Sequence, residues 1–195
     1  MLPLPPSLPS TIQCTWRDFE HGQPAEPLAR LWLAGVLGWE PAAVALVRDA
    51  LGRPRLGASQ HEWDVSWSHS GQGLLIAMGE GVDIGVDLER IKPLPRALAL
   101  ARRFFAGSEA DWLAALPIQA HESAFLRLWC AKESVLKAHG RGLAFGLDKL
   151  AFGEVDGVLQ LLACDRQLGQ PDDWALREFM PRPGYRAAIA WRDKR

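Results

Sequence analysis

The chain has 195 residues, of which 48% are hydrophobic and 23% charged, and its formal net charge is −1. This composition supports a packed core and excludes wholesale disorder, collagen and coiled coil. The charge balance argues against a broad nucleic-acid surface. The three cysteines, Cys14, Cys130 and Cys164, are too few and too scattered for a disulfide framework or a Cys-x-x-Cys zinc site.

The first ten residues are broken by prolines and contain no basic residue, unlike a signal peptide. No apolar run approaches the roughly 18 residues that a membrane helix needs. Together with the cysteine content, this predicts a cytoplasmic protein that binds neither membrane nor nucleic acid.

Hydrophobic spacing and turn residues predict the elements of the first half of the chain. They are an extended arm to Thr11, strands at 12–19, 62–68, 73–78 and 82–89, and helices at 27–39 and 41–50. Gly52-Arg-Pro-Arg55 is expected to be a loop. The tight connection Gly79-Glu80-Gly81 predicts a hairpin between the last two strands.

Lys92-Pro93-Leu94-Pro95 is the clearest break in the chain, because two prolines in three residues withhold backbone hydrogen bonds. After it, we expect helices at 96–105, 109–115 and 120–139, and strands at 147–152, 158–162, 174–180 and 185–191. Ser108 is expected to cap the second of these helices, and Gly140 to end the third.

Gly81-Val-Asp-Ile-Gly-Val-Asp-Leu-Glu89 alternates apolar and polar residues, as a strand with two unlike faces does. The alternation places Asp87 and Glu89 on one face, roughly 7 Å apart. Their charges repel unless a cation lies between them, and oxygen ligands suit Mg²⁺. Gly85 leaves room for a ligand at the backbone, and Asp83 is expected to be structural or solvent-facing. The alternative is an ordinary solvated strand face.

The helix at 120–139 places Trp129, Glu133 and Lys137 on one face, with Trp129 expected in the core. Lysine carries a compact charge that suits phosphate. The alternative is a salt-bridged surface face.

Asp64-Val-Ser-Trp-Ser-His-Ser70 alternates as well, with Ser66, Ser68 and Ser70 on one face. These hydroxyls and His69 could hold phosphate oxygens at the strand end. A nucleophile–base pair is not favoured, because neighbours on a strand point apart and Gly-x-Ser-x-Gly is absent. The alternative is that these polar side chains only form hydrogen bonds within the protein at the end of the strand.

In this order, the three segments resemble the motifs of the 4′-phosphopantetheinyl transferase superfamily, in its Sfp-type branch. They are Ser-x-Ser-His-Ser, Gly-Val-Asp-Leu-Glu and Trp-x-x-Lys-Glu-Ser-x-x-Lys. Three further pieces are similar to the family: Gly52-Arg-Pro54, Arg103-Phe-Phe105 followed by Glu109, and Gly140-Arg-Gly-Leu143. The resemblance covers about residues 30–148.

The resemblance implies transfer of the phosphopantetheine arm of coenzyme A to a serine of an apo acyl or peptidyl carrier protein. The released product would be adenosine 3′,5′-bisphosphate. It also implies an α+β fold of two pseudo-symmetric lobes in a monomer, each a small antiparallel sheet packed with a long helix. The Pro-rich break would separate a lobe at 1–92, carrying the Ser-His segment and the Asp-x-Glu strand, from a lobe at 93–195, carrying the Trp-x-x-Lys-Glu helix.

The resemblance also implies roles for residues near the reacting phosphates. Asp87, Glu89 and Glu133 would be the Mg²⁺ ligands. Glu133 would be the general base on the carrier serine, with Glu89 acting through a metal-bound water as its rival. Lys137 would contact the leaving α-phosphate, and Lys132 the pyrophosphate.

The remaining implied roles concern the nucleotide and the carrier protein. Ser68 and His69 would contact phosphates of coenzyme A, with His69 at the 3′-phosphate. Arg53 would lie near the adenine and its phosphate, in place of the family's lysine, and Arg30 is a further candidate there. A basic and apolar surface for the acidic carrier protein is expected from the residues that follow the break: Arg96, Arg102, Arg103 and Phe104.

Two other functions remain compatible with the residues. One is another Mg²⁺-dependent phosphoryl-group enzyme, a phosphatase or pyrophosphatase that uses the same acids. The other is a non-catalytic protein that binds coenzyme A or a carrier protein.

Overall fold

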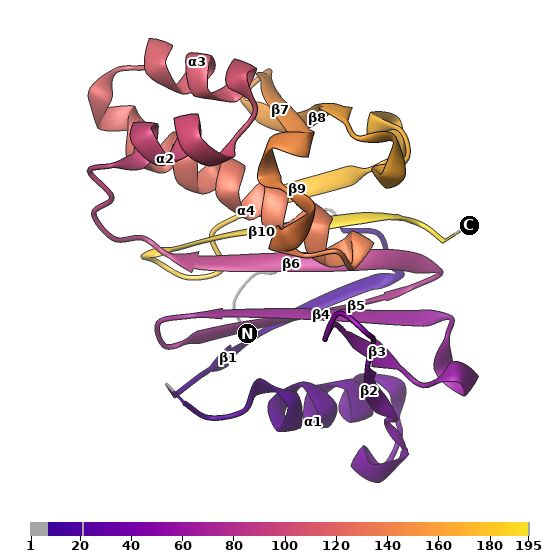
Figure 1. Ribbon diagram of the computed structural model, residues 1–195. Coiled ribbons are helices and arrows are strands. Elements are labelled where there is room, and N and C mark those ends of the chain that lie inside the picture. The colour runs from indigo at the N-terminus through magenta and orange to yellow at the C-terminus, as the bar shows by residue number, and fades with distance from the viewer. Residues whose placement is uncertain (1–7, 21, 195) are drawn as a thin grey trace.

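The computed structural model describes residues 8–20 and 22–194, so the predicted N-terminal arm lies largely outside the described residues. The chain folds into four stacked layers, with a helix on each side of two antiparallel sheets (Figure 1). This arrangement confirms the predicted α+β class with small antiparallel sheets and packed helices. None of the helices in the described part of the chain has the length and apolarity to cross a membrane.

The first sheet has the strand order β1-β5-β4, and its outer face is covered by helix α1 (Ala25–Leu37). Its strands are β1 (Ile12–Asp18), β4 (Trp63–Ser70) and β5 (Gly73–Glu80). Leu33 of α1 packs with Leu74, Ile76 and Met78 of β5 in one buried cluster. The other face of β5 presents Leu75 and Ala77 to the second sheet.

The second sheet has the order β6-β10-β9 and packs directly on the first. Its strands are β6 (Val82–Arg90), β9 (Ala175–Phe179) and β10 (Tyr185–Asp193). The apolar residues of β6 face the first sheet, as the alternation predicted; they are Val82, Ile84, Val86 and Leu88. The acidic face of β6 therefore points toward the helices on the other side.

The outermost layer consists of three helices and a hairpin. The helices are α2 (Ala97–Phe104), α3 (Gly107–Ala115) and α4 (His121–His139), and the hairpin pairs β7 (Leu150–Val155) with β8 (Val158–Cys164). Helix α4 ends at Gly140, which has the left-handed backbone conformation of a helix C-cap, as predicted.

Gly85 lets α4 approach β6 closely. A Cβ atom at Gly85 would lie 2.0 Å from the carbonyl oxygen of Ser134 and 2.4 Å from the backbone nitrogen of Ala138. The missing side chain therefore makes room for α4 rather than for a ligand, which corrects the sequence interpretation of this glycine.

Three local predictions are wrong. Residues 41–50 form a single 3₁₀ turn (Pro41–Ala43) and the strand β2 (Leu46–Arg48), which pairs with β3 (Pro54–Leu56). The helix is not formed because the Asp49 carboxylate accepts hydrogen bonds from the backbone nitrogens of Leu51 and Arg53 and so closes a hairpin turn.

The other two concern a hairpin and a cap. Strand β5 is hydrogen bonded to β1 on one side and β4 on the other, so it has no free edge for β6. Ser108 does not cap α3; the helix begins after Ala106, whose backbone nitrogen donates to the Glu109 carboxylate.

The second sheet joins strands from both sides of the Pro-rich break, because β6 precedes residue 92 and its partner β10 ends the chain. The division into lobes at 1–92 and 93–195 stays a prediction.

Candidate functional site

A cluster of charged side chains lies where the acidic face of β6 meets α4. The Nζ atom of Lys137 donates to Asp87 Oδ1 at 2.7 Å and to Ser68 Oγ at 2.9 Å. Ser68 Oγ also donates to Asp87 Oδ1 at 2.9 Å. Glu133 lies one helical turn before Lys137 on α4, so both side chains point toward the strand.

The carboxylates of this cluster repel one another. Burial, and then the charge of Asp87, raise the pKa of Glu133 from 4.5 to about 7, and Glu89 adds to the effect. Burial and the charge of Asp87 also raise the pKa of Glu89. Three acids thus share one small region with the ammonium of Lys137, which favours binding of a further cation.

Two carboxylate oxygens of the cluster have no hydrogen-bond partner although they are buried: Asp87 Oδ2 and Glu133 Oε1. Buried polar atoms are normally satisfied, so these two suit a ligand that carries positive charge. An all-oxygen donor set of this kind matches Mg²⁺. Among the described residues, no three Asp, Glu, His or Cys side chains already have the spacing of a finished metal site. The donor atoms and the charge of these residues fit the ion. Lys137 hydrogen bonds to one Asp87 oxygen and fixes its position.

Lys132 does not reach this cluster. Its Nζ atom lies 2.6 Å from the Glu109 carboxylate and donates to the carbonyl oxygens of Leu147, at 2.7 Å, and Leu150. Consecutive residues of a helix are turned by about 100°, so Lys132 points into the helical layer while Glu133 points to β6. This placement differs from the pyrophosphate contact that the motif implied.

Arg53 is a largely buried link between the N-terminal part of the chain and α4. Its guanidinium lies 2.5 Å from Asp64 Oδ2 and donates to the carbonyl oxygens of Ala138 and Ile84 at 2.7 and 2.8 Å. The first two bonds join the β2–β3 hairpin to β4 and to the end of α4. Arg53 thus has a structural role in addition to any ligand contact.

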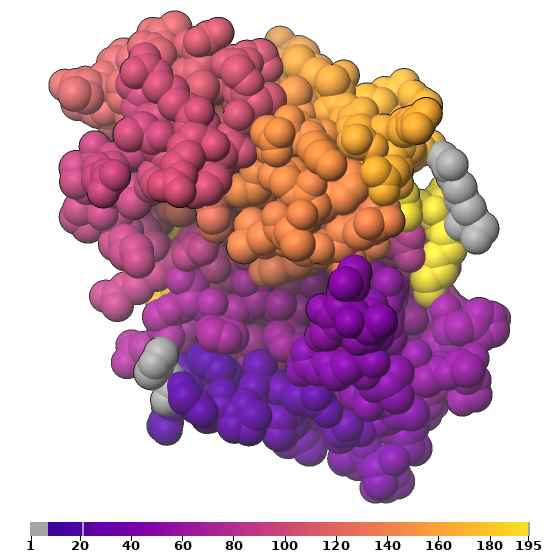
Figure 2. Space-filling view, viewed as in Figure 1, coloured from indigo at the N-terminus to yellow at the C-terminus, as the bar shows by residue number. Residues whose placement is uncertain are grey.

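A basic pocket of about 260 Å³ lies between the β2–β3 hairpin and the end of α4. It is lined by Arg48, Arg53, Trp67, Lys137 and Arg141, among others, and the Arg48 guanidinium lies 5.4 Å from the centre of the Trp67 ring. In Figure 2, the purple surface of this hairpin lies directly below the orange surface that follows α4. The positive charge, the aromatic ring and the shared Lys137 suit an anionic ligand that extends to the acid cluster.

Two predicted site residues lie elsewhere. Arg30 on α1 pairs with Glu26 at 3.1 Å and donates to the Val44 carbonyl, so its charge is used within the first layer. His69 is exposed on the face of β4 opposite to Ser68 and stacks on Phe19, with the ring centres 4.7 Å apart. Neither belongs to the acid cluster or lines the basic pocket.

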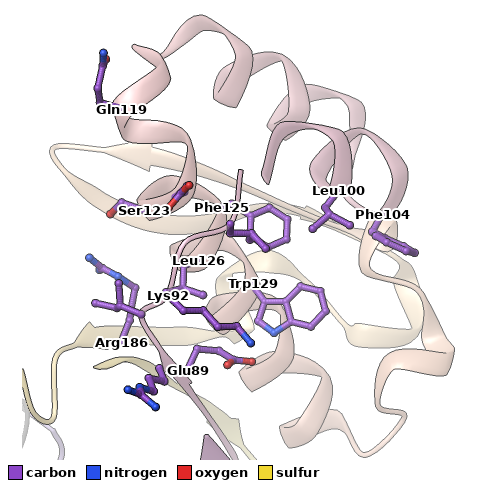
Figure 3. Close-up of a pocket in the computed structure, with 14 residues that line it drawn as sticks. Glu89, Lys92, Leu100, Phe104, Gln119, Ser123, Phe125, Leu126, Trp129 and Arg186 are labelled. Carbon is purple, nitrogen blue, oxygen red and sulfur yellow. The ribbon is translucent and has the colours of Figure 1, made fainter. Parts of the chain in front are cut away.

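A second groove, of about 450 Å³, begins at Glu89 and runs between α4 and α2. Figure 3 shows Glu89, Lys92 and Arg186 at one end and Leu100 and Phe104 at the other. Its walls are mostly apolar and include Phe125, Leu126 and Trp129 of α4. Trp129 therefore contributes to the groove as well as to the core, where it was expected.

Sequence reasoning missed two residues that shape the site. Glu109 was quoted only as part of a motif, and nothing in the local pattern shows that it pairs with Lys132. Ser70 was considered together with Ser66 and Ser68 as a candidate to hold phosphate oxygens, whereas its hydroxyl donates to Glu89 Oε2 at 2.9 Å. The sequence did contain a signal for this contact. Ser68 and Ser70 are two residues apart on one strand, as Asp87 and Glu89 are on another, so the two pairs can face each other.

Comparison with known proteins agrees with these features. A family model described as the 4′-phosphopantetheinyl transferase superfamily matches residues 83–190. The 4′-phosphopantetheinyl transferase HetI of Nostoc sp. is 34% identical over 165 residues, which cover 84% of this chain and 67% of HetI.

The 4′-phosphopantetheinyl transferase Sfp of Bacillus subtilis is 31% identical over 123 residues, covering 63% of this chain and 52% of Sfp. The structure of Thermotoga maritima holo-[acyl-carrier-protein] synthase is 18% identical with a TM-score of 0.46, covering 58% of this chain and 64% of that one. Because the family model matches more than half of the chain and HetI aligns over two thirds of its length, the chain belongs to the 4′-phosphopantetheinyl transferase superfamily, as an enzyme of its Sfp-type branch.

Proposed function

We propose that the chain transfers 4′-phosphopantetheine from coenzyme A to a serine of an apo acyl or peptidyl carrier protein, in a magnesium-dependent reaction. The observation that carries this proposal is the meeting of Asp87, Glu89, Glu133 and Lys137 between β6 and α4, with two buried carboxylate oxygens left without partners. The chain supplies all of these groups by itself, which favours a monomer.

Asp87, Glu89 and Glu133 would hold Mg²⁺. When bound, the ion supplies charge neutralisation to the pyrophosphate of coenzyme A. The raised pKa values of Glu89 and Glu133 support this assignment, since both carboxylates lack sufficient positive charge nearby.

The carrier serine attacks the phosphorus atom that bears the pantetheine, and the bond from that phosphorus to the bridging oxygen breaks. The serine gives its proton to Glu133, and adenosine 3′,5′-bisphosphate leaves with the bridging oxygen. In the metal-free chain, burial and the charge of Asp87 raise the pKa of Glu133 to about 7, and a bound cation would lower it, so the assignment of Glu133 as the base rests on the place of its carboxylate in the cluster. Glu89, whose pKa is also raised, is the other candidate base.

Lys137 would stabilise the leaving phosphate. Its ammonium already lies in the cluster and also lines the basic pocket, so it can contact a ligand that occupies both. We assign the pocket to the adenosine bisphosphate part of coenzyme A, where Arg48 and Arg141 offset phosphate charge and Trp67 offers a flat ring. Arg53 borders the same pocket from its buried position.

The carrier protein would dock at the groove that begins at Glu89. Phe104 is 39% exposed at its far end, and Arg102 and Arg103 are exposed beside it. An apolar groove with a basic rim suits an acidic helical protein, and it leads the serine toward the acid cluster. All three cysteines are free thiols, which agrees with the reducing cytoplasm as the setting.

The deciding experiment incubates the protein with coenzyme A, Mg²⁺ and a panel of apo carrier proteins, and measures intact carrier mass. We expect a mass gain of one phosphopantetheine group that requires Mg²⁺ and is lost in Glu133→Gln. Hydrolysis of coenzyme A without carrier modification would instead establish the phosphatase or pyrophosphatase alternative. Binding of coenzyme A without either reaction would establish a non-catalytic binding protein.

A further inference from the structure

Strands β4 and β6 belong to different sheets and are joined by side chains instead of a backbone ladder. Three side-chain oxygens of β4 accept hydrogen bonds from backbone nitrogens of β6: Asp64 from Ile84 at 2.8 Å, Ser66 from Val86 at 3.1 Å, and Ser70 from Arg90 at 3.0 Å. The partners are 20 residues apart in every case. The strands therefore run in the same direction, and the stripe of alternate polar residues on β4 sets their register.

Ser70, the last member of this stripe, also contacts an acid of the cluster. Its Oγ atom accepts from the backbone nitrogen of Arg90, so its single proton is free to be donated to Glu89 Oε2, 2.9 Å away. One hydroxyl thus ties the Glu89 carboxylate to the backbone of the residue that follows it.

Glu89 needs such a tether more than its neighbour Asp87 does. Asp87 is 3% exposed and is held by Lys137 and Ser68, whereas Glu89 is only partly buried and lies at the mouth of the groove. The charge of Asp87 repels the Glu89 carboxylate, while Lys137 in the cluster and Lys92 in the groove attract it. A glutamate side chain has three rotatable bonds, so an untethered Glu89 would sample orientations away from the cluster.

We infer that Ser70 is a positioning residue that holds Glu89 in the orientation needed to bind the divalent cation. The inference rests on the proposed function, because it takes Glu89 to be a metal ligand. Partners that orient metal ligands in this way commonly set metal affinity. Substitution of Ser70 is easier to interpret than substitution of Ser68. The Ser68 hydroxyl contacts both Asp87 and Lys137, so its loss would disturb two groups of the cluster.

The test measures Mn²⁺ affinity from the electron paramagnetic resonance signal of the free ion, with coenzyme A present and no carrier protein. We expect Ser70→Ala to raise the Mn²⁺ dissociation constant by about 10-fold or more. Ser70→Thr should restore most of the affinity because it keeps the hydroxyl, and the KM for coenzyme A should change little in both variants.

Ser66→Ala is the control for the loss of a β4–β6 hydrogen bond, because the Ser66 hydroxyl accepts from the backbone nitrogen of Val86. Since Ser66 also lines the basic pocket, the two variants are compared with Mn²⁺ alone as well as with coenzyme A present. Ser66→Ala should lower thermal stability to a similar extent and leave the Mn²⁺ affinity unchanged. Equal losses of Mn²⁺ affinity in Ser66→Ala and Ser70→Ala, without rescue by threonine, would mean a purely structural role and would overturn the inference. Should Ser70→Ala not fold, Ser70→Cys, with its weaker donor, is expected to give an intermediate affinity.

The outcomes separate this inference from the proposed function. Wild-type protein that binds no Mn²⁺, or binding that survives Asp87→Asn and Glu89→Gln, would remove the metal site itself and both claims with it. Wild-type binding that is weakened by Glu89→Gln but not by Ser70→Ala would leave the proposed function standing and reject the role of Ser70.

Discussion

The Nζ atom of Lys132 lies 2.6 Å from the Glu109 carboxylate, and neither side chain is exposed to solvent. Glu109 also accepts from the backbone nitrogens of Ala106 and Phe152, so this pair connects α3, α4 and β7. Burial lowers the pKa of Lys132 from its ordinary value, and the facing carboxylate offsets part of that effect. The motif lysine next to Glu133 thus belongs to the core of the helical layer.

This pairing predicts that Lys132→Ala acts on stability. The substitution leaves a buried carboxylate without its partner, which costs about 3–5 kcal/mol. We expect a matching decrease in the free energy of unfolding measured with urea. The double variant Lys132→Met with Glu109→Leu should recover much of the loss, because no buried charge remains. A stable Lys132→Ala protein with only a raised KM for coenzyme A would favour the pyrophosphate contact instead.

Glu133 should make the stability of the metal-free protein depend on pH. Its pKa is raised from 4.5 to about 7, so the folded state binds more protons than the unfolded state between these values. The contribution of Glu133 to the free energy of unfolding is therefore fully present below about pH 4.5 and is lost as the pH rises through about 7. Glu89, whose pKa is also raised, acts in the same direction.

We expect Glu133→Gln to flatten this slope in thermal unfolding measured with a chelator. Added Mg²⁺ should stabilise the wild-type protein more above about pH 7 than below it, because the ion binds ionised carboxylates. An unchanged slope in Glu133→Gln would mean that other groups cause the dependence.

Gly85→Ala should separate α4 from β6. The new methyl group would overlap the backbone of Ser134 and Ala138, which cannot move independently of the helix. We expect a loss of about 1–3 kcal/mol or more in unfolding free energy, and a larger relative loss of transfer activity, since Glu133 and Lys137 move away from Asp87.

Gly35→Ala is the control, because Gly35 is an exposed glycine of α1 with no atom within 4 Å of the added methyl group. It should raise stability by about 0.5–1 kcal/mol and leave activity unchanged. A Gly85→Ala protein with normal activity would contradict the close approach of helix and strand as a requirement of the site.

Phe104→Asp should weaken binding of the carrier protein. If the acidic carrier protein docks at this groove as proposed, a negative charge at its end would repel the carrier, so we expect the KM for the carrier to rise about 10-fold, which corresponds to about 1.4 kcal/mol. The KM for coenzyme A should not change. Leu31→Asp, at an exposed apolar position on α1 in the opposite outer layer, is the control and should affect neither constant. Equal effects of both substitutions would argue against docking at this groove.

The amino-acid sequence alone predicts most strands and helices, and its motifs resemble those of the family, which implies the α+β class. It also determined which side chains of β6 face the sheet core and which face away. The strands, the helices and the two faces of β6 follow from local backbone geometry: the alternation of Val82, Ile84, Val86 and Leu88 has only one orientation that buries all four. The end of α4 at Gly140 is equally local, because the C-cap needs a left-handed residue.

Which elements lie next to one another depends on the packing of the whole chain. Strand β6 pairs with β10, more than 90 residues later, because both edges of β5 are already occupied. The direction of Lys132 depends on Glu109, which lies on another helix. The hydrogen bond from Ser70 to Glu89 depends on the packing of the first sheet, which contains β4, against the second, which contains β6. The residues that meet in these contacts are far apart along the chain, and no periodic pattern in the sequence relates them. The contacts therefore follow from the packing of the layers and not from any local pattern.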